Sequence, residues 1–144
     1  MPICCDTSFL FATYANDVHT RKALSELNQI SRAIHISVLN QFEFENALRL
    51  AAFRKLLPTG SVLSILADFE ADFGSGKLIL APVNLASAIA EARRLSARYT
   101  LRLGHRAFDT LHIGAALSLR ATTFLSFDER QRKLAGAEGL LVKP

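Results

Sequence analysis

The sequence has few cysteines and no long hydrophobic run, and both absences exclude classes of protein. Its only cysteines, Cys4 and Cys5, are adjacent and cannot join distant parts of the chain, which excludes a disulfide-framed secreted scaffold. On a strand they would face opposite sides as small buried groups. No stretch approaches the roughly 18 uncharged apolar residues that a membrane-spanning helix needs. We therefore expect a protein of the reducing cytoplasm with no membrane contact.

The length and composition indicate one folded domain. The chain has 144 residues, of which 50% are hydrophobic and 21% charged, with a net charge of +4. A chain of this size has room for one hydrophobic core, and its low net charge with many apolar residues argues against disorder. We expect residues 1–144 to form a single domain without repeats or linkers.

The positive charge is concentrated in one segment. The sequence pI is about 9.4, which favours polyanionic or acidic partners. Between residues 93 and 106 there are five arginines and no acid: Arg93, Arg94, Arg98, Arg102 and Arg106. They form either a solvated helix face or a surface for a negatively charged partner, and the pattern alone leaves both open.

Short apolar runs alternate with longer amphipathic stretches along the chain. Strands are predicted at residues 3–5, 33–36, 77–80, 123–127 and, as an edge strand, 139–142. Helices are predicted to begin after Asp6, to cover residues 38–57, 61–73, 85–99 and 105–119, and to follow Asp128. Ser37 is placed to cap the second of these helices. This order predicts an α/β domain with a mostly parallel sheet covered by helices on both faces.

Two acids directly follow predicted strands. Asp6 comes after residues 3–5, and Asp128 comes after residues 123–127. Ligands of open parallel sheets bind at the carboxyl ends of the strands, so both carboxylates are candidate site residues. Helix capping is the alternative for each, because an Asp at a helix start accepts backbone N–H groups.

Glu43 lies within an apolar stripe of the predicted helix at residues 38–57. At 100° per residue the stripe contains Leu39, Phe42, Asn46, Ala47, Leu50 and Phe53. Glu45 points to the other side, where Arg49 offers a surface ion pair. We therefore expect Glu43 to be buried, and a buried carboxylate needs a metal ion or an ion-pair partner such as an arginine.

Asp109 lies on a predicted helix that carries apolar residues on both sides and is expected to be largely buried. His112, one turn later, is a candidate partner for it, as a core histidine with a satisfied hydrogen bond. Together, the two acids at strand ends and the two on helices would repel one another in one cleft unless a cation neutralised them. Oxygen ligands without a Cys/His cluster select Mg²⁺ or Mn²⁺, and such an ion suits phosphodiester hydrolysis.

Four segments carry a recognisable pattern: residues 5–10 (CDTSFL), 43–48 (EFENAL), 109–116 (DTLHIGAA) and 125–131 (LSFDERQ). In this order they resemble the PIN domain family, and in particular the VapC-type ribonuclease toxins of toxin–antitoxin modules. The resemblance implies a three-layer, Rossmann-like sandwich in which an acidic quartet binds Mg²⁺ or Mn²⁺ and hydrolyses RNA. Position by position, the quartet is Asp6, Glu43, Asp109 and Asp128.

The resemblance also implies further residues and partners. The accessory polar residues are Thr7, Ser8, Asn46 and Ser126; Ser126 stands where the family more often has Thr and retains the hydroxyl. The five arginines would contact RNA phosphates. The expected protein partners are an antitoxin and a second copy of the chain, and the apolar residues Phe44, Leu48 and Leu56 would offer them a surface unless they pack on the next helix.

The sequence also allows other functions. One alternative is a non-catalytic module that binds protein or RNA, in which the acids form internal ion pairs with the arginines. A haloacid-dehalogenase-like phosphatase wants a second Asp at position 8, where this chain has Ser, and the paired acids and late Lys of a receiver domain are not evident. No Gly-rich Lys-Ser/Thr loop is present, which excludes a P-loop nucleotide enzyme.

Overall fold

The computed structural model describes residues 1–144, and the strands and helices alternate along them. The strands are β1 (Ile3–Cys5), β2 (Ile34–Ile36), β3 (Leu78–Leu80), β4 (Thr123–Leu125) and β5 (Leu141–Lys143). The helices are α1 (Thr7–Tyr14), α2 (Thr20–Gln29), α3 (Val38–Phe53), α4 (Thr59–Gly74), α5 (Leu85–Leu95), α6 (Leu101–Leu103), α7 (Ala107–Ser118) and α8 (Glu129–Ala137). A π-helical segment, Ser96–Thr100, joins α5 to α6.

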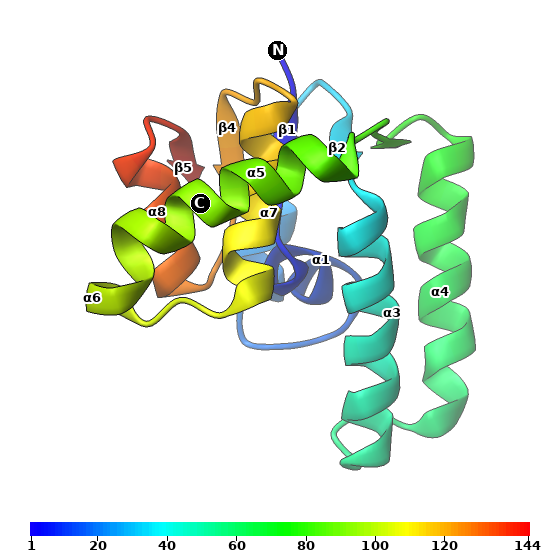
Figure 1. Cartoon of the computed structure of the whole chain (residues 1–144). Coiled ribbons are helices and arrows are strands. Elements are labelled where there is room, and N and C mark those ends of the chain that lie inside the picture. Colours follow the sequence, from blue (N-terminus) through cyan, green and yellow to red (C-terminus); the bar gives the residue numbers. More distant parts are fainter.

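The five strands form one sheet in the order β3-β2-β1-β4-β5, and every pair is parallel. The central strand β1 pairs with β2 on one side and with β4 on the other, and β5 is an edge strand as predicted. Because the strands are parallel, their carboxyl ends share one edge, at which β1 leads into α1 (Figure 1). The predicted α/β class and parallel sheet are confirmed.

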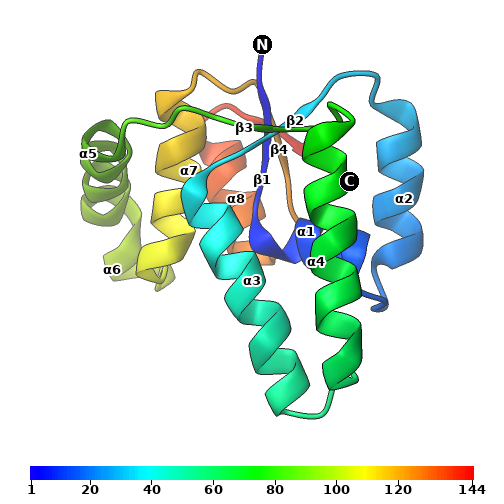
Figure 2. The same ribbon diagram turned by 90° about the vertical axis from the view of Figure 1, so that its right-hand side faces the viewer.

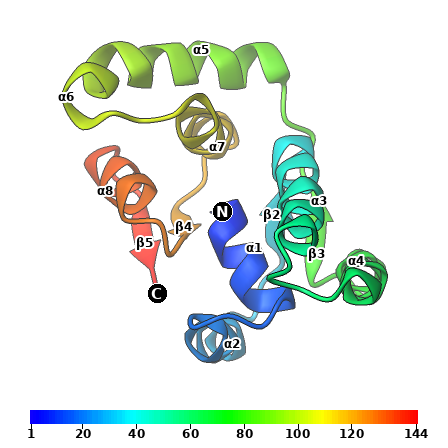
Figure 3. The ribbon, with the colours of Figure 1, turned by 90° about the horizontal axis from the view of Figure 1, so that it is seen from below.

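Helices cover both faces of the sheet because successive strand side chains point to opposite sides. Cys5 and Leu125 belong to a core cluster with residues of α1 to α4. Their neighbours Cys4 and Phe124 belong to a second cluster with residues of α5, α7 and α8. Figure 3 shows α5 and α7 on one side of the strands and α1 and α2 on the other. The molecule is the expected three-layer sandwich.

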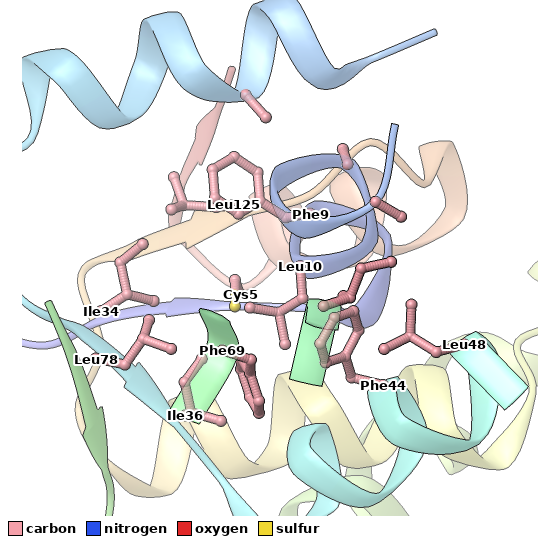
Figure 4. Close-up of a cluster of buried hydrophobic side chains, with 14 of the residues drawn as sticks. Cys5, Phe9, Leu10, Ile34, Ile36, Phe44, Leu48, Phe69, Leu78 and Leu125 are labelled. Atoms are coloured by element: carbon pink, nitrogen blue, oxygen red, sulfur yellow. The ribbon is translucent and has the colours of Figure 1, made fainter. Parts of the chain in front are cut away.

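The larger cluster lies between the sheet and α1, α3 and α4. Figure 4 shows Phe9 and Leu10 of α1 together with Phe44 of α3 and Phe69 of α4 next to the strands. Cys5 lies within this cluster, and both cysteines are free and buried, as expected. Burial raises the pKa of the Cys4 thiol to about 12, so it stays protonated and unreactive.

The helix α3 buries a different face from the one predicted. Its buried side chains are Asn40, Phe44, Leu48 and Ala51. Phe42 and Phe53 of the predicted stripe are 62% and 83% exposed. The α3–α4 hairpin projects beyond the rest of the fold, so the far end of the stripe has no layer to pack against (Figure 2). The stripe prediction was therefore wrong, and Phe44 and Leu48 are core residues that offer no surface to a partner.

Two other helices differ from the sequence-based expectation. The helix that begins at Leu85 was predicted to end at Tyr99. Instead, helical structure continues through the π-helical segment and α6 to Leu103, and Gly104, with a φ of 68°, ends it. The helix α2 was not predicted, because only Ala23 and Glu26 of its ten residues are buried and its hydrophobic pattern is short. None of the helices is long and apolar enough to cross a membrane.

The helices α5 and α7 pack with their backbones close together. Gly114 of α7 faces α5, and a Cβ atom built on it would lie 2.6 Å from the carbonyl oxygen of Ala88 and 2.9 Å from the nitrogen of Ala92. Only a residue without a side chain fits there. This contact holds the arginine-bearing helix against the helix that carries Asp109 and His112.

Candidate functional site

Asp6 is completely buried at the carboxyl end of the central strand. Its Oδ1 accepts hydrogen bonds from the Ser8 hydroxyl at 2.6 Å and from the backbone N–H of Phe9 at 3.1 Å, so it caps α1. Its Oδ2 accepts a hydrogen bond from the Ser126 hydroxyl at 2.6 Å. Burial raises the pKa of Asp6, while the bonds from Ser126 and Ser8 act in the opposite direction.

Ser126 links Asp6 to Asp128. Its hydroxyl oxygen, which donates to Asp6, also accepts the backbone N–H of Asp128 at 3.0 Å. The Ser8 hydroxyl likewise accepts the backbone N–H of Phe127 at 3.0 Å. Asp128 caps α8 through Oδ1, which accepts from the N–H of Gln131 at 3.0 Å. The capping role considered for each of the two acids is therefore present, and it occupies one oxygen of Asp128.

Glu43 contacts His112 across the gap between α3 and α7. The Nε2 atom of His112 lies 3.0 Å from Oε1 of Glu43, whose side chain is 31% exposed. Burial is the largest single influence on the pKa of Glu43 and raises it, but the hydrogen bond and electrostatic interaction with His112 and the proximity of Thr7 together lower the pKa. Thr7 is adjacent to Asp6 in the chain. Glu43 is thus an ionised acid near Asp6.

The hydrogen bonds of Asn40 determine which nitrogen of His112 carries the proton. Asn40 Oδ1 accepts from the backbone N–H of Ser37 at 3.1 Å, so its Nδ2 points the other way. That amide donates to the Cys5 carbonyl at 3.0 Å and to His112 Nδ1 at 3.2 Å. Because Nδ1 accepts, the neutral ring has its proton on Nε2 and donates it to Glu43. Asn40 and His112 together orient Glu43.

Asp109 is half-buried at the start of α7, and its Oδ2 accepts the backbone N–H of Arg106 at 2.9 Å. The expected contact between Asp109 and His112 is not formed, because the His112 ring points to Glu43 and Asn40. His112 is nevertheless a buried, hydrogen-bonded histidine, as expected. Asp109 lies one helical turn before it.

No lysine or arginine pairs with any of the four acids. The acid–base pairs of the structure lie elsewhere, among them the predicted pair of Arg49 with Glu45 at 3.7 Å. Internal ion pairs with the arginines therefore do not account for the acids. The acids are not preassembled either, since no three His, Cys, Asp or Glu side chains lie within reach of one ion.

The donor set nonetheless fits a hard cation chemically. Glu43 Oε2, Asp109 Oδ1 and Asp128 Oδ2 have no hydrogen-bond partner, and all are carboxylate oxygens.

The predicted accessory residues differ in their placement. Ser8 and Ser126 hydrogen-bond directly to Asp6, whereas Asn46 is exposed on α3 and forms no hydrogen bond. Sequence reasoning missed Asn40. The available signal was its position three residues after Ser37, where the two side chains form a reciprocal capping box.

The five arginines are all exposed. Arg94 pairs with Glu91 at 2.8 Å and with Glu138 at 2.9 Å. The other four have no acidic partner, and Arg98 lies over the Tyr99 ring. Figure 1 shows α6 and the loop that leads to α7 at the same end of the molecule as α1, the end toward which β1 runs. The segment that carries Arg102 and Arg106 therefore lies toward the end of the molecule at which β1 ends.

Two cavities are prominent. The larger, of about 580 Å³, lies between α2 and α4 and is lined by Leu24, Asp68 and Lys77, with none of the four acids. A shallower pocket, of about 400 Å³, is lined by Ser8, Asp128 and residues that follow α1. Only the second adjoins the candidate site.

Comparison with known proteins identifies the family. The PIN domain model matches residues 3–137, and the chain therefore belongs to the PIN domain family. No curated protein is detectably similar in sequence.

Solved structures share the fold at low sequence identity. VapC20 of Mycobacterium tuberculosis, described as a sarcin-ricin loop cleaving toxin, is 17% identical with a TM-score of 0.71, covering 99% of both chains. VapBC2 of Rickettsia felis, solved with a DNA fragment from its promoter, is 15% identical with a TM-score of 0.72, covering 99% of this chain and 98% of that one. FitAcB of Neisseria gonorrhoeae is 15% identical with a TM-score of 0.63, covering 99% and 96%. The fold is that of VapC toxins.

Proposed function

We propose that this protein is a divalent-metal-dependent endoribonuclease, the toxin of a toxin–antitoxin pair. The observation that carries the proposal is a set of carboxylates near the carboxyl edge of the sheet that no lysine or arginine neutralises. Membership of the PIN domain family and the fold shared with VapC toxins, one of which is described as a sarcin-ricin loop cleaving toxin, support it.

In this proposal Asp6, Glu43, Asp109 and Asp128 hold Mg²⁺ or Mn²⁺. The ion would supply water activation, phosphate orientation and charge neutralisation. The chain's own contribution is orientation: Ser8 and Ser126 fix the Asp6 carboxylate. The proton on His112 Nε2 fixes one oxygen of Glu43 and leaves the other, Oε2, available to the ion.

The test is cleavage of total RNA in Mg²⁺, in Mn²⁺ and in EDTA. We expect cleavage with either ion and none with the chelator. Asp109→Asn should lower the rate by at least about a hundredfold, the upper end of what changes outside the ligand shell cost. Asp68→Asn, the same substitution at an exposed position on α4, is the matched control and should cleave at the wild-type rate. Equal rates for the wild type and Asp109→Asn would contradict the proposal.

A non-catalytic module that binds protein or RNA is the second candidate. The observation that favours it is that no three of the acids lie within reach of one ion. The two readings differ in a thermal melt, because an ion that binds only the folded state raises Tm. The ribonuclease reading predicts a higher Tm with Mn²⁺ than with excess EDTA, and the second candidate predicts the same Tm in both.

We also propose an antitoxin and a second copy of this chain as partners. The exposed apolar side chains of α3 and the turn after it support a protein partner on that hairpin: Phe42 lies near the start of α3, and Phe53 and Leu56 lie at its far end. Light scattering on the isolated chain measures whether it forms the dimer, and a mass of one chain would contradict that part of the proposal.

A further inference from the structure

The shallow pocket next to Asp128 is lined in part by residues that do not belong to the proposed metal site. The lining includes Thr7, Ser8 and Asp128 of the candidate site and also Asp17 and His19, from the segment between α1 and α2. Its volume of about 400 Å³ lies within the range of ligand pockets, roughly 300–1,000 Å³. A group held there would lie directly beside the carboxylates.

Three rings form a continuous stack at this pocket. The Phe127 ring is stacked nearly parallel to the buried Phe9, with 5.8 Å between the ring centroids, and nearly parallel to His19, with 4.5 Å between the centroids. His19 is an exposed residue with one ring face covered by Phe127, so its second face is available to a further ring. The stack therefore extends from Phe9, which is buried in the core, to His19, which is exposed to solvent.

The polar atoms of Asp17 and His19 are only partly used. Asp17 Oδ1 accepts the backbone N–H of His19 at 2.8 Å, which fixes the carboxylate. Asp17 Oδ2 and both ring nitrogens of His19 have no hydrogen-bond partner. A ligand that fits must offer a flat ring to His19 and N–H donors to Asp17. A phosphate does not fit, because Asp17 and Asp128 would repel it.

We propose that this pocket is a nucleobase subsite for the RNA, in which a base stacks on His19 and donates hydrogen bonds to Asp17. Guanine fits best, because its N1–H and N2–H₂ groups present adjacent donors to a carboxylate, whereas uracil presents one. This inference rests on the proposed function, since it names which part of the substrate that site selects. Aromatic stacking of bases is a general means of binding single-stranded RNA.

The test is binding of labelled hexaribonucleotides in EDTA, where metal-dependent cleavage does not occur. Each hexamer is oligouridine with guanine, inosine or uracil at one central position, and fluorescence anisotropy gives Kd. We expect the guanine hexamer to bind most tightly and the inosine hexamer, which lacks the N2 amino group, more weakly. His19→Ala should weaken binding of the guanine hexamer roughly five- to hundredfold, and His19→Phe, which retains a ring, should restore it.

A second variant separates base selection from stacking. Asp17→Asn keeps an oxygen for the N–H of His19 but replaces the free acceptor with an amide donor. We expect the ratio of the Kd values for the uracil and guanine hexamers to fall to near one. Asp68→Asn on α4 is the matched control and should leave this ratio unchanged.

Failure of this inference differs from failure of the proposed function. If the protein cleaves RNA with Mn²⁺ but binds all hexamers equally, or binds none, or if His19→Ala binds like the wild type, the subsite is wrong and the ribonuclease stands. If the protein neither binds hexamers nor cleaves RNA, both are wrong.

Discussion

At the scale of single residues, Asp6 shows how hydrogen bonds partly compensate for the burial of a carboxylate. The side chain is fully buried but accepts three hydrogen bonds, two of them from serines. Burial disfavours the ionised form, whereas charge-assisted hydrogen bonds favour it. Burial is the larger of the two effects, so the pKa is raised. An added cation would offset that unfavourable effect.

The raised pKa of Asp6 predicts a dependence of stability on pH. The folded state binds this proton more tightly than the unfolded state, whose Asp pKa is about 3.9. The Asp6 contribution to the free energy of unfolding is therefore most favourable below that value and is lost as pH rises through the raised pKa. Asp6→Asn has no titrating group there, so its stability relative to the wild type should increase with pH.

Urea denaturation in EDTA between pH 4 and pH 8 measures this difference for the two proteins. A constant difference across the range would show that burial of Asp6 has no such effect on the folded state.

Asn40 is the residue on which the orientation of Glu43 depends. Asn40→Ala leaves the Ser37 N–H, the Cys5 carbonyl and His112 Nδ1 without their partners inside the protein. Each unsatisfied buried group costs about 1–3 kcal/mol, so we expect the free energy of unfolding to fall by roughly 3 kcal/mol or more. Asn46→Ala, an exposed position on the same helix, should change it by less than about 0.5 kcal/mol.

Nitrogen NMR of the His112 ring tests the same network without a mutation. We expect a protonated Nε2 and an unprotonated Nδ1 in the folded chain. A proton on Nδ1 would contradict the assignment of the Asn40 amide and the orientation of Glu43 that follows from it.

The sequence identified some of these residues and missed others for physical reasons. The positions of Asp6 and Asp128 between a strand and a helix followed from the sequence, because an acid directly after an apolar run is a local signal. His112 was paired with Asp109, one turn away on the same helix, whereas its actual partners come from α3. Only the packing of α3 against α7 brings them together, and local periodicity carries no information about it.

At the scale of elements, the contact between α5 and α7 is the most sensitive to substitution. Gly114→Ala would place a methyl group 2.6 Å from the Ala88 carbonyl oxygen, and the two backbones would have to separate. Overpacking typically costs 1–3 kcal/mol. Alanine recovers up to about 1 kcal/mol in helix propensity. We expect a net loss of roughly 1 kcal/mol in the free energy of unfolding.

Gly136→Ala on α8 is the matched control. The nearest atom to its added Cβ is a methyl carbon of Val142 at 3.8 Å, an ordinary contact. Urea denaturation should show unchanged or slightly increased stability for this variant. Equal stabilities for the two alanine variants would contradict the close approach at Gly114.

The starts of several helices could be predicted from the sequence because capping residues mark them. Ser37 caps α3, and Asp6 and Asp128 cap α1 and α8, as the local patterns predicted. The buried face of α3 could not be predicted from the sequence, because the apolar residues of this helix occupy more than one side. Which side is buried depends on where the sheet ends, and the α3–α4 hairpin extends past that point (Figure 2).

At the scale of the whole molecule, the charge distribution predicts how RNA binding depends on salt. Arg93, Arg98, Arg102 and Arg106 have no acidic partner. If all four contact phosphates of single-stranded RNA, log affinity should fall with log salt concentration with a slope of about −3. Replacing Arg102 with Gln should reduce the magnitude of the slope by about 0.7.

Arg94 provides the control, because it is already paired with Glu91 and Glu138. Arg94→Gln should leave the slope nearly unchanged. Binding measured by fluorescence anisotropy at several salt concentrations gives the slopes, and equal slopes for wild type and Arg102→Gln would remove Arg102 from the RNA surface.

The central claim is that divalent metal binding unites carboxylates that no lysine or arginine of the protein neutralises. Anomalous X-ray scattering from crystals grown with Mn²⁺ tests it most directly. We predict a manganese peak within about 2.0–2.5 Å of carboxylate oxygens from at least two of Asp6, Glu43, Asp109 and Asp128. Crystals saturated with Mn²⁺ that show no manganese at these side chains would contradict the account.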